Sequence, residues 1–123
     1  MKIFFDGGCR PGGMEYAVVL GGQALIEGDL GPGSAMEAEW LALIAATRLA
    51  VERGVSDAIL LGDALAVIAQ ANGKVRVPPL CRPYFERWSA LPRPARLRLR
   101  YVKRTQNLAG IALERLRQKM GSG

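Results

Sequence analysis

The chain of 123 residues contains no histidine and only two cysteines, Cys9 and Cys81. Without histidine it lacks the most common general base of enzymes. Two cysteines alone are too few for a zinc site or for a disulfide framework. Any catalysis by this chain must therefore rest on carboxylates and a metal ion.

Long apolar runs are also absent. No run approaches the length of a membrane span, and the N-terminus lacks a signal-peptide pattern, so we expect a cytoplasmic protein. Half of the residues are hydrophobic, which is enough for one core in a chain of this length. We predict a single domain over residues 1–120 and a flexible tail over 121–123.

Negative charge is scarce relative to positive charge. The chain has 17 Lys and Arg against 11 Asp and Glu, a net charge of +6, and this balance favours a polyanionic partner. The alternative is that the basic residues form an ordinary solvated surface. The candidates for a phosphate-binding groove are Arg10, Lys74, Arg76, Arg82, Lys103 and Arg104.

The spacing of apolar residues, glycines and prolines predicts an α/β fold. We expect strands over residues 2–5, 15–20, 23–30, 58–61 and 96–102, and helices over 34–53, 64–71, 83–91 and 107–120. Residues 7–13 read as a glycine-rich loop. A right-handed crossover sets the fourth strand parallel to the first, which gives a five-stranded mixed sheet of order 3-2-1-4-5. The last strand alternates basic and apolar residues, as an edge strand with one basic face does.

Three carboxylates are the candidate site. Asp6 and Asp63 each follow an apolar run, and Glu39 lies near the start of the helix predicted over 34–53. The predicted topology brings the ends of the two strands together at a position where α/β sheets bind ligands. Acidic groups gathered there repel each other unless a cation is bound, and hard oxygen ligands select Mg²⁺ or Mn²⁺.

Each carboxylate also has a purely structural interpretation. Asp6 is suited to a turn and Asp63 to the N-cap of the helix that follows it. Glu39 lies on one flank of the helix's apolar stripe and Glu37 on the other, so periodicity does not choose between them. Ser34 and Glu37 form a capping-box pattern, which gives Glu37 a structural role.

The motifs in order resemble the ribonuclease H family, type one, in its compact form. The segments that carry the resemblance are Ile3-Phe4-Phe5-Asp6-Gly7-Gly8, Ala38-Glu39-Trp40-Leu41-Ala42-Leu43, Leu60-Leu61-Gly62-Asp63 and Arg104-Thr105-Gln106-Asn107. The resemblance selects Glu39 and implies two-metal hydrolysis of the RNA strand of RNA/DNA hybrids, with 5′-phosphate and 3′-hydroxyl products. Asp6 would bridge both ions, and Glu39 and Asp63 would each support one. The implied nucleic-acid contacts are Gly7, Gly8, Cys9, Arg10, Lys103, Arg104 and Asn107.

The chain departs from the family pattern at a fourth carboxylate, which is expected four residues after Asn107. Ile111 occupies that place, on the side opposite the apolar stripe predicted for the helix. Glu114 lies one turn later, and its alternative interpretation is a surface pair with Arg117. Polar residues that grip a hybrid are also missing, because Ser34-Ala35-Met36 stands where the family has Thr-Asn-Asn. The alternative function is therefore a catalytically impaired, ribonuclease H-like nucleic-acid-binding module, and a protein-interaction scaffold is a third.

Overall fold

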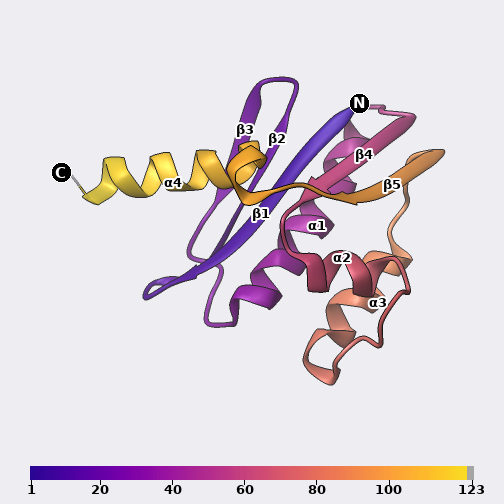
Figure 1. The fold of residues 1–123 in the computed structure, drawn as a ribbon, viewed down its shortest axis with the longest axis horizontal. Coiled ribbons are helices and arrows are strands. Elements are labelled where there is room, and N and C mark those ends of the chain that lie inside the picture. Colours follow the sequence, from indigo (N-terminus) through magenta and orange to yellow (C-terminus); the bar gives the residue numbers. More distant parts are fainter. Residues whose placement is uncertain (122–123) are drawn as a thin grey trace.

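A five-stranded mixed sheet forms the centre of the computed structural model, which describes residues 1–121 (Figure 1). The strand order is β3-β2-β1-β4-β5, as predicted. Strands β1, β2 and β3 pair in antiparallel fashion, whereas β1–β4 and β4–β5 are parallel. The strands are β1 (Lys2–Arg10), β2 (Gly13–Leu20), β3 (Gln23–Glu27), β4 (Asp57–Gly62) and β5 (Arg96–Tyr101).

Helices cover the two faces of the sheet unequally. Helix α1 (Ala35–Glu52) packs along one face with α3 (Arg82–Ala90), and α4 (Leu108–Gly121) packs against the other face at β1 and β2. The short α2 (Leu65–Ala71) follows β4, and single 3₁₀ turns, η1 (Pro79–Cys81) and η2 (Arg104–Gln106), precede α3 and α4. None of the helices in the described part of the chain has the length and hydropathy needed to cross a membrane.

The main core lies between the sheet and the layer of α1 and α3. Trp40 is fully buried there, and Trp88 packs against it with ring centroids 6.2 Å apart. Trp40 Nε1 donates to Gln70 Oε1 at 3.1 Å, and Trp88 Nε1 donates to Thr47 Oγ1 at 2.9 Å. Because each large ring removes about 150–250 Å² from water, both tryptophans serve the core. A second, smaller cluster lies under α4 and consists of Ala17, Val19, Ala109 and Leu113.

The prediction of a loop over residues 7–13 was wrong. Strand β1 continues to Arg10 and stays paired with β2 up to the Arg10–Gly13 pair, so Asp6 lies within the strand, opposite Ala17. In β1, Gly7 and Gly8 permit close packing and do not form a turn. A Cβ atom on Gly7 would lie only 2.6 Å from the backbone N of Glu39, so Gly7 allows the start of α1 to lie directly on β1.

Two predicted ends also differ from the structure. Strand β3 ends at Glu27, before the predicted end at Leu30, because Asp29 turns the chain with a φ of 54°. Of the tail predicted over 121–123, Gly121 is the last residue of α4, and residues 122 and 123 lie outside the described part of the chain.

Candidate active site

The parallel pairing of β1 and β4 sets the position of the two aspartates. The paired residues run from Lys2–Ile59 to Phe4–Leu61. Continued two residues further, the same register places Asp6 beside Asp63. Asp6 is buried at 5% exposure, and Asp63 is partly buried just beyond the end of β4. The sheet topology thus brings together two acids that are far apart in sequence.

Glu39 completes the cluster from α1. One carboxylate oxygen from each of Asp6, Glu39 and Asp63 lies within 4.8 Å of those of the other two. Glu39 is itself buried, at 8% exposure. The structure therefore brings the three predicted acids together in one place, at a spacing that a divalent cation can occupy.

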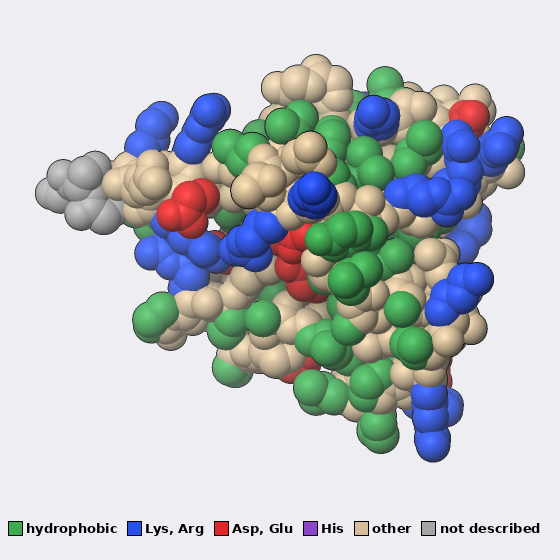
Figure 2. Space-filling model, viewed as in Figure 1, with side chains coloured by type: hydrophobic (Ala, Val, Ile, Leu, Met, Phe, Trp, Pro, Cys, Tyr) green, Lys and Arg blue, Asp and Glu red, His purple; other side chains and the backbone are tan. Residues whose placement is uncertain are grey.

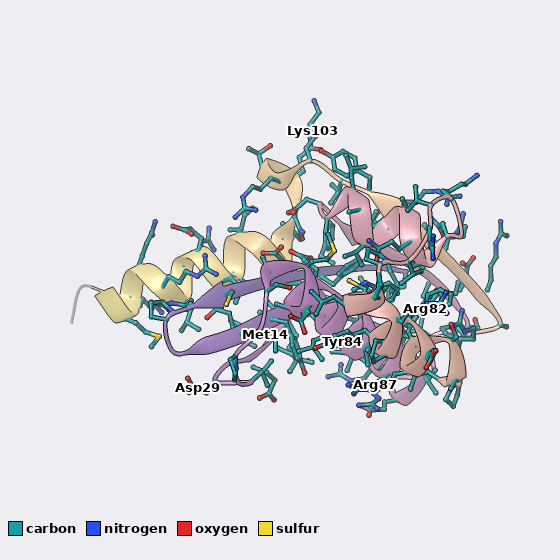
Figure 3. The ribbon with its side chains drawn as sticks, turned by 90° about the horizontal axis from the view of Figure 1, so that it is seen from below. Met14, Asp29, Arg82, Tyr84, Arg87 and Lys103 are labelled. Atoms are coloured by element: carbon teal, nitrogen blue, oxygen red, sulfur yellow. The ribbon has the colours of Figure 1, made fainter. Side chains whose placement is uncertain are left out.

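The choice between Glu37 and Glu39 follows from the helix start. Glu37 is used by the predicted capping box: its backbone N donates to Ser34 Oγ at 3.1 Å, and its Oε1 accepts from the Ser34 backbone N at 2.9 Å. Its other oxygen accepts from Tyr84 Oη at 2.8 Å, on the α3 side of the molecule, where Tyr84 is labelled in Figure 3. Glu37 is therefore structural, and Glu39 is the acid directed at Asp6.

Asn107 fixes the geometry of the site from the start of α4. Its Nδ2 donates to Asp63 Oδ2 and to the Phe5 carbonyl oxygen, both at 3.0 Å, and its Oδ1 accepts from the Ala109 backbone N at 3.1 Å. Asn107 has no exposed surface, so in this structure it positions Asp63 and caps α4. Asp63 does not cap α2, whose N-cap is Ala64 without a side-chain bond.

Two buried carboxylate oxygens, Asp6 Oδ1 and Glu39 Oε2, have no hydrogen-bond partner among the described residues. The pKa of Glu39 is raised to about 9, first by burial and then by the neighbouring Asp6 and Asp63, against a lowering contribution from the Gly7 backbone amide. Burial also raises the pKa of Asp6, although its hydrogen bond with Glu39 opposes this. Buried oxygens without donors are unfavourable, so the cluster fits a group that supplies positive charge.

Two arginines lie near the acids without neutralising them. Arg104 Nη1 is 3.9 Å from Asp63 Oδ1, and the Arg104 side chain is 75% exposed. Arg117 is held by Glu15, with Nη2 2.6 Å from Oε2, across the backbone of Gly8. Figure 2 shows the acidic group near the middle of this face, with basic side chains beside it. Because Arg104 is exposed to solvent and adjacent to the acids, it is well placed to meet a phosphate.

The metal-free protein should lose stability as pH rises. Glu39 has a pKa of about 9 in the folded protein against 4.5 ordinarily, so between these values the folded state holds a proton that the unfolded state has lost. The contribution of this Glu39 proton to the free energy of unfolding is complete below pH 4.5. It then declines by about 1.4 kcal/mol per pH unit until pH 9. Urea unfolding in EDTA should show this decline, and Glu39→Gln should flatten it.

Glu37→Gln is the matched control for this pH series, because it removes a carboxylate from the same helix. The capping bonds hold the pKa of Glu37 below its usual value, so this variant should leave the decline between pH 4.5 and 9 in place. An equally steep decline in Glu39→Gln would mean that Glu39 does not hold the proton.

The predicted contacts Cys9 and Arg10 lie at the end of β1, and Lys103 and Arg104 follow β5. Cys9 Sγ donates to the Gly33 carbonyl oxygen at 3.0 Å, where the β1–β2 turn meets the loop before α1 around a cavity of about 300 Å³. Arg10 lines this cavity, whereas Arg104 lies beside Asp63, with Nη1 3.9 Å from Oδ1. A larger cavity of about 540 Å³, between α1 and β2–β3, contains none of the three acids.

The place of the missing fourth carboxylate is occupied by apolar residues. Gly110 faces the site, because a Cβ atom there would lie 3.2 Å from Asp6 Oδ2. Ile111 is the next residue and is partly buried. The Glu114 carboxylate is 59% exposed and lies 3.9 Å from Arg117, as its alternative interpretation predicted. Sequence reasoning did not identify Gly110, although a glycine in the first turn of a helix is a signal of close approach.

The fold and the acid cluster together define a ribonuclease H-like domain. The chain belongs to the family described as reverse transcriptase-like, whose family model matches residues 18–114. That match includes Glu39 and Asp63 and begins after Asp6. No curated protein matches the chain.

The solved structures that are similar to this chain include ribonucleases H. The N-terminal ribonuclease H domain of Rv2228c from Mycobacterium tuberculosis is 26% identical, with a TM-score of 0.76 over 91% of this chain and 93% of that one. Ribonuclease H1 of Halobacterium salinarum is 27% identical, with a TM-score of 0.77 over 91% and 92%. LC11 ribonuclease H1, solved in complex with an RNA/DNA hybrid, shares the fold at 18% identity and a TM-score of 0.70 over 86% and 87%.

Proposed function

We propose that this protein is a metal-dependent endonuclease that hydrolyses the RNA strand of RNA/DNA hybrids. The observation that carries the proposal is the trio of Asp6, Glu39 and Asp63, with oxygens within 4.8 Å of one another and two buried oxygens without a donor. The similarity to ribonucleases H, one of them solved with a hybrid, supports the same substrate class.

The donor set suits Mg²⁺ or Mn²⁺, because all three groups are carboxylates and the chain has no histidine. Two such ions, when bound, would activate a water molecule and stabilise the leaving oxygen of the phosphodiester. Asp6 would serve both ions, while Glu39 and Asp63 would each support one. Ion binding requires Glu39 to release its proton, which couples occupancy of the site to pH.

The remaining residues orient the site and the substrate. Asn107 holds Asp63 in place through its 3.0 Å bond to Oδ2, and the backbone of Gly7 lets Glu39 approach. Arg104 extends into solvent beside Asp63, where it would bind the phosphate next to the cleaved bond. Gly8, Cys9 and Arg10, at the end of β1, would also contact the nucleic acid.

The test is cleavage of a panel of equally long duplexes labelled on one strand. We expect the RNA strand of a hybrid to be cut in Mg²⁺ or Mn²⁺, while duplex DNA stays intact, and the fragments to carry 5′-phosphate and 3′-hydroxyl ends. Cleavage of all duplexes alike, or fragments that keep the phosphate on the 3′ side, would contradict the proposal.

A second candidate is a binding module with impaired turnover. It is favoured by the apolar groups at Gly110 and Ile111, where the family has a carboxylate. This candidate requires binding of hybrids that falls steeply with salt, together with no cleavage in either metal. Cleavage that is lost when Asp6 is replaced would exclude it.

A further inference from the structure

The face of the sheet that carries α4 is only half covered. Helix α4 packs against β1, β2 and β3. In Figure 1 it lies over that half of the sheet, and among residues 1–121 no other helix lies in front of β4 and β5. The surface formed there by β4 and β5, which we call the open face, is therefore available to a partner.

The open face is basic because of the alternation along β5. Leu99 is buried in the main core, so its neighbours Arg98 and Arg100 point to the opposite side of the sheet, and Arg96 shares their parity. The register aligns Lys2 of β1, Ile59 of β4 and Arg98 of β5 in one row. Figure 2 shows basic side chains gathered toward the right of the view, where β4 and β5 lie in Figure 1.

These positive charges are weakly compensated within the protein. Among the described residues, one ion pair involves the three arginines, between Arg98 Nη2 and Asp57 Oδ1 at 3.1 Å. Both partners are partly exposed, so the pair contributes at most about 1 kcal/mol. Arg98 Nε is buried without a hydrogen-bond partner, and Arg96 and Arg100 are exposed. The open face thus holds one buried donor without a partner, Arg98 Nε, and an excess of positive charge.

The row of arginines leads to the acid cluster. Strands β4 and β5 run parallel, so Arg96, Arg98 and Arg100 approach the sheet edge at which Asp63 lies. Arginines two residues apart on a strand are spaced by about 6.6 Å, and the row spans about 13 Å. The chain then continues through Lys103 to Arg104, 3.9 Å from Asp63. A polyanion that crosses the acids and continues in this direction meets one basic group after another.

We propose that the open face is a second phosphate-binding surface, which holds the nucleic-acid backbone on one flank of the cleaved bond. The inference rests on the proposed function, because continuity with the cleavage site favours nucleic acid over an acidic protein. Phosphate contacts of this kind fix the position of the duplex without reading its sequence.

The test measures affinity for an RNA/DNA hybrid in an Asp6→Asn background, which prevents cleavage. The variant is Arg96→Gln/Arg98→Gln/Arg100→Gln. The matched control is Arg48→Gln/Arg53→Gln/Arg87→Gln, which removes equal charge from the opposite side of the molecule; Figure 3 labels Arg87 there, away from Lys103. Fluorescence anisotropy over a salt series gives the slope of log affinity against log salt, and melting temperatures confirm that each variant is folded.

We expect the open-face variant to bind more weakly and to lose about one unit of salt slope per arginine, while the control keeps most of the slope. The loss should be larger for a long hybrid than for a short one that spans only the acids. Equal slopes in the two variants, or binding by the open-face variant that matches the unmodified background, would overturn the inference. New self-association with unchanged binding would also overturn it and would assign the arginines to protection of the edge strand. If Asp6→Asn with its open-face arginines intact does not bind the hybrid, the proposed function itself is contradicted, separately from this inference.

Discussion

Asp6→Asn should abolish the stabilisation of this protein by Mg²⁺ or Mn²⁺. Ions that bind only the folded state stabilise it by about 2.7 kcal/mol at one hundred times Kd, which is a rise in Tm on the order of 10 °C for a chain of this size. One carboxylate oxygen of Asp6 lies within 4.8 Å of one oxygen of Glu39 and one of Asp63. Thermal unfolding with and without each metal measures the effect.

Removal of this charge should also raise the Tm of the metal-free protein, because the Asp6 carboxylate is buried and lies close to Asp63, so the substitution relieves both the desolvation of its charge and that repulsion. Asp29→Asn is the control: Asp29 is exposed in a loop with a φ of 54°, a conformation that asparagine also tolerates. It should leave the metal response intact. A metal response that survives in Asp6→Asn would place the ion elsewhere.

Ile111→Asp should increase cleavage, most strongly in Mg²⁺. With three carboxylates, the site has one negative charge fewer than the family pattern and should hold a second ion poorly. Mn²⁺ should support more activity than Mg²⁺ in the wild type, because Mn²⁺ demands less strict coordination geometry. Mutation of a group that only hydrogen-bonds to a metal ligand lowers metal affinity or activity by about 10–100-fold. The gain from adding a direct ligand should be at least as large. Rates in both metals, measured for wild type and variant, test the prediction.

The helical register predicted that Ile111 lies away from the core, and in the structure it is partly buried. We therefore expect a moderate loss of stability from Ile111→Asp, about 1–2 kcal/mol. Ile111→Asn is the control, because it makes the position polar without adding charge and should not raise cleavage. If Glu114→Gln abolishes an activity that Ile111→Asp leaves unchanged, Glu114 supplies the fourth ligand and the family register does not apply to α4.

Much of the fold was predictable because its signals are local. The alternation along β5, the capping box at Ser34 and the apolar stripe of α1 each constrain one element, and the handedness of crossovers orders the strands. Asp6 and Asp63 followed from this topology, since parallel strands in register deliver their ends to one place. Periodicity did not separate Glu39 from Glu37, because both flank the same stripe. The capping box gave Glu37 a structural role, and the family resemblance selected Glu39.

What the sequence did not reveal depends on contacts between distant segments. Gly7 and Gly8 were read as a loop, yet both lie in β1, where Gly7 admits α1 and Gly8 lies beneath the Arg117–Glu15 pair. The buried bonds of Asn107 to Asp63 and Phe5 join residues 44 and 102 positions apart. Such packing has no periodic signature, so propensity and patterning cannot find it.

Cleavage of an RNA/DNA hybrid by wild type and by Asp6→Asn, with the RNA strand labelled and Mn²⁺ present, tests the central claim most directly. The three acids are proposed to act as one metal-dependent catalytic site, so wild type should cut the RNA strand, and Asp6→Asn and wild type in EDTA should both leave it intact. Equal cutting by wild type and Asp6→Asn would contradict the claim, as would an intact RNA strand in all three reactions.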